Sequence, residues 1–189
     1  VGARLLERGT SSSGDVTKIS SQLDRSSTTA DGRRVMIDLY RRLAESHADR
    51  YTLALRALAA GEVPAIVACT AGKDRTGMAI AILMELIGAP RATTIENYAI
   101  SEQFHDFMGM FEREAKAAEV AGRTDSAYLN LMRTVSRDAL RTIFASDPDY
   151  VVAALSELEA TYGSIDGYAQ QRLGLTGDEI AALRHHLVV

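Results

Sequence analysis

VACTAGKDRTG, residues Val67–Gly77, is the stretch that decides the expected fold, because it lies between two apolar segments of different character. The segment before it, Pro64–Ala68, is short and β-branched and is bounded by turn residues, which predicts a buried strand. The segment after it, Thr76–Leu86, predicts an apolar helix that ends near Gly88 and Pro90. We therefore expect a strand, a tight loop and a helix.

Such a loop predicts an anion site that contains the only cysteine of the chain, Cys69. Its backbone N–H groups converge at a helix N-terminus, where unpaired donors and the helix dipole favour an anion. The same surroundings lower a thiol pKa from about 8.5 into a range of about 3.5 to 7.5, which populates the nucleophilic thiolate at neutral pH. Arg75 can direct its planar fork at two oxygens of one phosphoryl group.

The spacing from Cys69 to Arg75, with five residues between them, resembles the signature of the protein tyrosine phosphatases. Gly72, Thr76 and Gly77 strengthen this resemblance, as do the flanking apolar segments. The full run CTAGKDRTG is more narrowly similar to bacterial tyrosine/serine phosphatases that also act on phosphoinositides, a family known from mycobacteria. Two further stretches agree with that family, and the resemblance extends from about residue 31 to the C-terminus. These stretches are Ile95–Tyr98 and Thr161–Tyr168.

The resemblance implies a reaction in which the Cys69 thiolate attacks phosphorus and forms a phosphocysteine that water hydrolyses. No cofactor and no metal is expected. Thr76 would donate its hydroxyl to the sulfur. Three residues are expected to be catalytic, namely Cys69, Arg75 and Asp74. The expected phosphate-binding residues are Thr70, Ala71, Gly72, Lys73, Asp74, Arg75 and Thr76.

The general acid has four candidates, and the residues alone leave them open. Asp15, Asp24 and Asp31 lie in a long polar segment, and phosphatases of this class place a mobile loop with an aspartate over the site. Asp74 lies in the phosphate loop itself, where a structural ion pair with Arg75 is the alternative to an acid role. The resemblance favours Asp74, because a lysine and aspartate pair is a feature of this family's loop.

Two other loop positions bear on activity. Lys73 is either a solvated charge or a second phosphate contact, and the second role would suit phosphoinositides or acidic phosphopeptides. Ala68 stands where the family usually has a histidine that supports the loop and helps to depress the thiol pKa. We therefore expect a higher thiol pKa and a lower activity at neutral pH than in a relative that has the histidine.

The expected fold class is α/β, as in the protein tyrosine phosphatases, with a mostly parallel central sheet flanked by helices and a helix-rich C-terminal part. We expect one phosphatase domain over residues 1–189. Residues 1–31 would form a strand at Ala3–Leu6 and a long flexible loop, and residues 32–189 the catalytic loop and the helical part. Because few strands are visible, the N-terminal part of the sheet is expected to be absent from this chain or divergent.

Periodicity predicts helices throughout the rest of the chain. Two consecutive helices follow Arg33, the second capped by Ser46, and a capping box at Thr176 and Glu179 opens the last helix. The aromatic face of Phe104–Ala121 packs on the core in one interpretation and forms a mobile lid over the site in the other. The remaining expected helices begin near Thr93 and cover Ser126–Phe144 and Asp149–Thr161.

Composition limits the other functions. A net charge of −4 gives no global attraction to nucleic acid or to an anionic membrane. No run is long enough to span a bilayer and no signal peptide is recognisable, so we expect a cytoplasmic protein, or one secreted without such a signal. The first residue is not methionine, which suggests a fragment or a processed form. The four histidines are expected at the surface or at helix ends rather than in a metal site. They are His47, His105, His185 and His186.

Two competing functions fail on the residues, and a third remains. A nucleotide-binding loop would need glycine where Val67 stands and serine or threonine where Asp74 stands. A sulfur-transfer enzyme has a shorter loop without this Gly-Lys-Asp-Arg-Thr-Gly run. The open alternative is a catalytically weak module that binds a phosphoprotein or a phosphoinositide. For the phosphatase, the expected partners are phosphoprotein, phosphopeptide or phosphoinositide substrates, and the oligomeric state stays open.

Overall fold

The structure is a computed structural model that describes residues 13–188 of the chain. Helices make up 72% of these residues, and none of them forms a strand. The strand expected at Ala3–Leu6 lies outside the described residues. In chain order the helices are α1 Ser13–Ser20, α2 Thr29–Ser46, α3 Ala48–Ala59, α4 Asp74–Leu86, α5 Arg91–Ala99, α6 Ser101–Phe104, α7 Phe107–Val120, α8 Ala127–Thr134, α9 Arg137–Phe144, α10 Pro148–Tyr162, α11 Ile165–Gln171 and α12 Gly177–Leu187.

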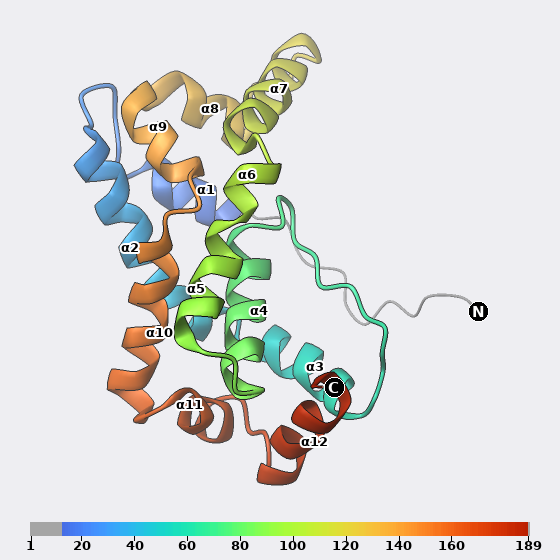
Figure 1. The fold of residues 1–189 in the computed structure, drawn as a ribbon. Coiled ribbons are helices and arrows are strands. Elements are labelled where there is room, and N and C mark those ends of the chain that lie inside the picture. The colour runs from blue at the N-terminus through green and yellow to red at the C-terminus, as the bar shows by residue number, and fades with distance from the viewer. Residues whose placement is uncertain (1–12, 189) are drawn as a thin grey trace. The chain divides into compact units, whose positions relative to one another are not determined.

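The α/β prediction with a central parallel sheet is wrong for the part of the chain that the structure describes. The predicted strand Pro64–Ala68 belongs to a long loop between α3 and α4 (Figure 1). Its side chains are not buried, since Ile66 is 94% exposed. A strand is stabilised by ladder hydrogen bonds and by packing of its faces, and no neighbouring strand supplies either one within residues 13–188.

The chain divides into two compact units. Within the described residues, unit 1 comprises Tyr40–Tyr98 and residues 148–188, and unit 2 comprises residues 13–39 and Ala99–Asp147. The loop that precedes α4 and the expected catalytic residues all belong to unit 1. Helix α2 contributes to both units, because the division falls between Leu39 and Tyr40.

Helix α4 is central to unit 1, since α10, α11 and α12 all contact it. Its apolar sequence is explained by these contacts on several sides. Met78, Ile82 and Leu86 are fully buried one turn apart along its length. Gly88, at φ 90°, allows the chain to turn after the helix, as the sequence predicts. The helix that follows the phosphate loop is therefore held firmly by the core.

Unit 2 has its own smaller core. Helix α7 packs against α8 and α9, and α1 packs against α8. The ring of Phe111 stacks on Tyr128 at 4.8 Å and on Phe144 at 4.5 Å between ring centroids. Figure 1 shows α7, α8 and α9 as separate short helices. Among the helices that the structure describes, none is long and apolar enough to cross a membrane.

Several helix predictions are confirmed and others need correction. The two consecutive helices are present, but the first begins at Thr29, before Arg33, and His47 rather than Ser46 occupies the N-cap of α3. The capping box at Thr176 and Glu179 is present at the start of α12. The long loop expected over Gly9–Asp31 contains α1, and α2 begins within it. Here local helix formation prevails over a polar, Ser-rich composition.

Two expected helices are each divided in two. The stretch Phe104–Ala121 breaks at His105 and Asp106, where the Asp106 carboxylate caps α7 by accepting a hydrogen bond from the N–H of Gly109. The interpretation as a core-packed helix is confirmed for Phe107 and Phe111, which are buried, but is wrong for Phe104, which is 74% exposed. The stretch Ser126–Phe144 divides into α8 and α9, and the second begins where Ser136 caps it.

Candidate active site

The candidate site lies where the loop of unit 1 enters α4. Lys73 is the N-cap residue of α4, and its side chain makes no capping hydrogen bond. The first intrahelical bond runs from the N–H of Gly77 to the Lys73 carbonyl at 2.8 Å. The N–H groups of Asp74, Arg75 and Thr76 therefore lie in the first turn, where an α-helix offers no carbonyl partners. These donors and the helix dipole favour a bound anion at this position.

The loop before the helix depends on Gly72. Its φ is +73°, a left-handed conformation that costs a residue with a side chain about 1 kcal/mol or more. No atom lies within 4 Å of the position that a Cβ would take. Glycine is therefore required here by the backbone conformation and not by crowding, which agrees with its predicted role in the loop.

Cys69 is partly buried beside this helix terminus. Burial is the largest single effect and raises the pKa of its thiol. The hydroxyl and the N–H of Thr76, the N–H of Gly72 and the positive charge of Arg75 together lower that pKa by more. The net result is a thiol pKa below its ordinary value, as the sequence predicts for a reactive cysteine.

The hydroxyl of Thr76 is suited to serve the sulfur. It is buried and meets no partner with regular hydrogen-bond geometry in the described part of the chain. The hydroxyl lowers the pKa of Cys69 because it stabilises the thiolate, which is a stronger hydrogen-bond acceptor than the thiol. The hydroxyl proton is therefore available when the thiolate forms.

Arg75 is held across the loop. One terminal nitrogen, Nη2, donates a hydrogen bond of 3.0 Å to the hydroxyl oxygen of Thr70. A guanidinium has five N–H donors, so this single bond leaves most of the fork for an anion. The structure thus brings together Cys69, Thr70, Arg75 and Thr76 around one helix terminus.

Lys73 and Asp74 form a pair at the start of α4. The Lys73 ammonium lies 3.3 Å from Oδ1 of Asp74, and the lysine side chain is only 2% exposed. The interpretation of Lys73 as a solvated charge is therefore wrong. The ion-pair partner of Asp74 is Lys73, whereas the alternative interpretation named Arg75. The hydroxyl of Tyr40 also donates to Oδ1 of Asp74 at 2.7 Å.

The other acid candidates lie in unit 2 and have local structural roles. Asp24 accepts hydrogen bonds from the N–H and the hydroxyl of Ser26, which lower the pKa of its carboxyl. Asp31 accepts from the N–H and the hydroxyl of Thr28, and these bonds lower its pKa as well. The side chain of Asp15 lies outside the described residues. The hydrogen bonds of both described carboxylates stay within their own turns.

Three tyrosines of unit 1 had no role in the site predicted from the sequence. Tyr40 is fully buried, and its hydroxyl lies 2.7 Å from that of Tyr98. Tyr98 ends the stretch Ile95–Tyr98, which carries part of the family resemblance. The resemblance includes this tyrosine but assigns it no function at the site. Tyr40 had no signal beyond its place in an apolar helical stripe. Tyr51 is also buried, and its hydroxyl has no partner among the described residues.

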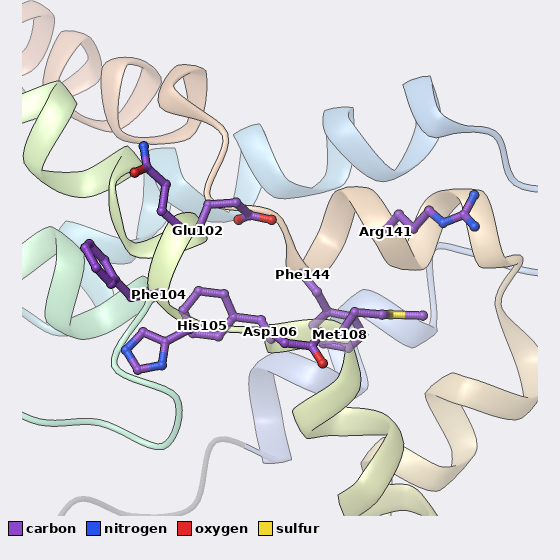
Figure 2. Close-up of a pocket in the computed structure, with 9 residues that line it drawn as sticks. Glu102, Phe104, His105, Asp106, Met108, Arg141 and Phe144 are labelled. Atoms are coloured by element: carbon purple, nitrogen blue, oxygen red, sulfur yellow. The ribbon is translucent and has the colours of Figure 1, made fainter.

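A cavity of about 470 Å³ lies in unit 2, lined by the junction of α6 and α7 and by part of α9. Figure 2 shows the rings of Phe104 and His105 and the side chain of Met108 from that junction, with Arg141 from α9. Glu102 contributes to the wall of the cavity. Its carboxylate accepts a hydrogen bond of 2.5 Å from the N–H of Ser146. No residue of the loop before α4 lines this cavity.

The four histidines lie at helix ends, as predicted. His47 occupies the N-cap position of α3 and His105 the C-cap position of α6. His185 and His186 belong to the last turn of α12, where a positive charge suits the helix dipole.

Comparisons with known proteins find phosphatases among the relatives of this chain. A triple specificity protein phosphatase, PtpB of Mycobacterium tuberculosis, is 29% identical over 139 residues, which cover 71% of this chain and 48% of that protein. A tyrosine-protein phosphatase of Nostoc commune is 30% identical over 124 residues, which cover 63% of this chain and 37% of that protein. The chain thus spans less than half the length of these two curated relatives.

A wider match comes from the scan against protein families. Residues 8–189 match the family described as the tyrosine phosphatase family. This match covers nearly the whole chain, including the loop, α4 and both stretches that carry the resemblance. It confirms the resemblance drawn from the CTAGKDRTG run, and the chain belongs to the tyrosine phosphatase family.

Proposed function

We propose that this chain is a cysteine-dependent phosphatase that hydrolyses phosphomonoesters. The observation that carries the proposal is the place of the Cys69 thiol at the N-terminus of α4, where Thr76, Gly72 and Arg75 surround it. A thiolate in front of unpaired backbone donors is the arrangement that a phosphoryl acceptor needs. Membership of the tyrosine phosphatase family supports the same reaction.

The reaction has two steps. The Cys69 sulfur forms a bond to phosphorus while the ester P–O bond breaks, and the leaving oxygen takes up a proton. Water then attacks the phosphocysteine, the S–P bond breaks, and inorganic phosphate and the thiolate are released. Thr76 donates its hydroxyl to the sulfur, so it stabilises the thiolate before the first step and again as it leaves in the second.

Transition-state stabilisation falls to the helix terminus and Arg75. The three equatorial oxygens of the transferred phosphoryl group gain charge, which the first-turn N–H groups and the guanidinium are suited to hold. Removing one such donor typically costs about 10²- to 10³-fold in rate. Asp74 is the candidate for the proton transfers because it lies beside Arg75 in the first turn of α4, whereas the hydrogen bonds of Asp24 and Asp31 stay within their own turns.

The proposed substrate class is phosphotyrosine first, with phosphoserine, phosphothreonine and phosphoinositides as further substrates. The family name supports the first, and the triple specificity of the mycobacterial relative supports the wider range.

The test compares hydrolysis of p-nitrophenyl phosphate and of a phosphotyrosine peptide by the wild-type chain and by Cys69→Ser. Turnover that is lost in Cys69→Ser is expected. Equal rates in both proteins would refute the proposal. If neither protein turns over but both bind vanadate, the alternative of a phosphate-binding module is favoured. Hydrolysis rates of a phosphoserine peptide and of a short-chain phosphoinositide are then compared with that of the phosphotyrosine peptide to rank the substrates.

A further inference from the structure

Three side chains of unit 1 form a continuous hydrogen-bonded chain that ends at the phosphate loop. The hydroxyl of Tyr40 donates to Oδ1 of Asp74 at 2.7 Å and lies 2.7 Å from the hydroxyl of Tyr98. Both tyrosines are buried, and Tyr40 is not exposed at all. These distances are typical of well-formed O–H···O hydrogen bonds.

The direction of the protons in this chain is fixed. Each hydroxyl carries one proton, and that of Tyr40 points to Asp74. Tyr98 must therefore donate to the oxygen of Tyr40, since the reverse bond would require a second proton on Tyr40. The sequence of donation runs from Tyr98 to Tyr40 and then to the carboxylate, and each bond polarises the next.

The two oxygens of the Asp74 carboxylate are not equivalent. Oδ1 receives the Tyr40 hydroxyl and lies 3.3 Å from the Lys73 ammonium. Because both groups are donors, Oδ1 carries no proton. Oδ2 accepts no hydrogen bond within residues 13–188, so any proton that this carboxylate holds or accepts resides on Oδ2.

The rings around the chain restrict its movement. Tyr40 lies edge to face with Tyr98, with centroids 5.9 Å apart, and packs against Tyr150 at 5.5 Å. On its other side the Tyr98 ring meets the first turn of α4, where a Cβ on Gly77 would lie 2.9 Å from Cδ2 of the ring. The absence of a side chain at Gly77 is therefore what allows Tyr98 to approach.

We propose that Tyr40, held in place by Tyr98, is a positioning residue that fixes Oδ1 of Asp74 and leaves Oδ2 as the oxygen that exchanges a proton with the reacting groups. The inference rests on the proposed function. In the first step the proton on Oδ2 passes to the leaving oxygen, and in the second the attacking water returns a proton to Oδ2. Tyr40 and Tyr98 act only through Asp74, and neither touches the substrate.

The test is a double-mutant cycle on p-nitrophenyl phosphate hydrolysis by the full chain. Tyr40→Phe keeps the ring and removes the hydroxyl, and we expect kcat to fall about tenfold with KM changed less than about twofold. In an Asp74→Asn background the same substitution is expected to change kcat less than about twofold, because the carboxylate through which it acts is gone. Tyr98→Phe, one bond further away, is expected to lower kcat about threefold.

Tyr162→Phe is the matched control. It removes a tyrosine hydroxyl that donates to a carboxylate at 2.6 Å in the same unit, but that carboxylate belongs to Glu45. We expect kcat and KM to match the wild type. Circular dichroism and the melting temperature of each variant establish that it is folded.

The outcomes separate the two proposals. If the wild-type chain turns over and depends on Cys69, additive effects of Tyr40→Phe and Asp74→Asn overturn the positioning role alone, as does an unchanged kcat in Tyr40→Phe. If turnover does not depend on Cys69, or none is seen, the proposed function fails. The positioning role is then tested by phosphate binding. The measured quantity is the phosphate concentration that halves the rate of Cys69 alkylation by iodoacetamide. A threefold or greater change in Tyr40→Phe, absent in the Asp74→Asn background, supports it, and no change overturns it.

Should Tyr40→Phe fail to fold, Tyr98→Phe replaces it in both measurements. It leaves the bond from Tyr40 to Asp74 in place, so it tests the same chain with a smaller perturbation. A loss of kcat that persists in full in the Asp74→Asn background would then overturn the inference.

Discussion

The guanidinium of Arg75 donates a 3.0 Å hydrogen bond to the hydroxyl of Thr70. This bond joins the residue that follows Cys69 to the arginine at the start of α4, across the anion site. Without phosphate, a long flexible arginine side chain would otherwise sample many rotamers, and ordering it costs up to about 2 kcal/mol. The bond to Thr70 holds the guanidinium near the position where it is needed. Preorganisation of this kind reduces the cost of binding an anion.

Thr70→Val is therefore expected to weaken phosphate binding. The substitution keeps the shape of the side chain but removes the acceptor for Arg75, and a net loss of about 1 kcal/mol corresponds to roughly a fivefold higher inhibition constant. Inhibition of p-nitrophenyl phosphate hydrolysis by inorganic phosphate measures it. Thr70→Ser retains the hydroxyl and serves as the control. Tighter phosphate inhibition in Thr70→Val would mean that the hydroxyl competes with phosphate for Arg75.

Arg75→Lys retains the positive charge and loses the planar fork. We expect kcat/KM to fall about 10²-fold or more, because an ammonium cannot bind two equatorial oxygens side by side. Steady-state kinetics with p-nitrophenyl phosphate measures the effect. Arg172→Lys, which changes an arginine that pairs with Glu45 in the same unit, provides the control. A loss below about threefold in Arg75→Lys would argue that only the charge matters.

Thr76→Val should make the thiol a weaker acid. The Thr76 hydroxyl is among the groups that lower the pKa of Cys69, so its removal shifts thiolate formation to higher pH. At a pH below both midpoints, alkylation by iodoacetamide is expected to be roughly fivefold slower than in the wild type. At high pH, where both thiols are ionised, the rates should converge. Thr76→Ser should resemble the wild type, and an unchanged pH profile in Thr76→Val would contradict this role.

Gly77→Ala tests the contact between α4 and Tyr98. Its Cβ would approach the Tyr98 ring to 2.9 Å, so the ring must shift and the bond from Tyr98 to Tyr40 weakens. We expect kcat to fall severalfold. The higher helix propensity of alanine than of glycine, worth up to about 1 kcal/mol, would stabilise α4 but would not restore the position of the ring. Gly177→Ala, in the first turn of α12 with nothing within 4 Å, makes the same change without a clash and should leave kcat unchanged. Equal activity of both variants would show that the ring approach is unimportant.

Local patterns allowed much of unit 1 to be predicted. The helix after the loop, its stop at Gly88 and the capping box at Thr176 follow from side-chain types a few residues apart, and all three are present. The lowered pKa of Cys69 also follows from local elements, since Thr76 and Gly72 belong to the same loop. Properties set within about ten residues were therefore accessible from the sequence.

Properties set by distant segments were not accessible. Tyr40 and Asp74 are 34 residues apart, and nothing in either neighbourhood indicates that their side chains meet. Burial of Lys73 also depends on tertiary packing, which a charged residue in a polar loop does not reveal. The strand prediction failed for a related reason. A short apolar run with β-branched residues predicts a strand that needs neighbours, and the sequence pattern does not say whether neighbours exist.

Ile66 and Ile82 offer a direct test of that last point. Ile66 is 94% exposed in the loop before α4, whereas Ile82 is fully buried in α4 of the same unit. Ile82→Ala is expected to lower the free energy of unfolding by about 2 to 5 kcal/mol, because it removes buried methyl groups and leaves a cavity. Ile66→Ala should change it by less than about 0.5 kcal/mol. Urea denaturation of both variants measures the difference. A loss above about 2 kcal/mol in Ile66→Ala would mean that this segment is buried in solution, as the strand prediction requires.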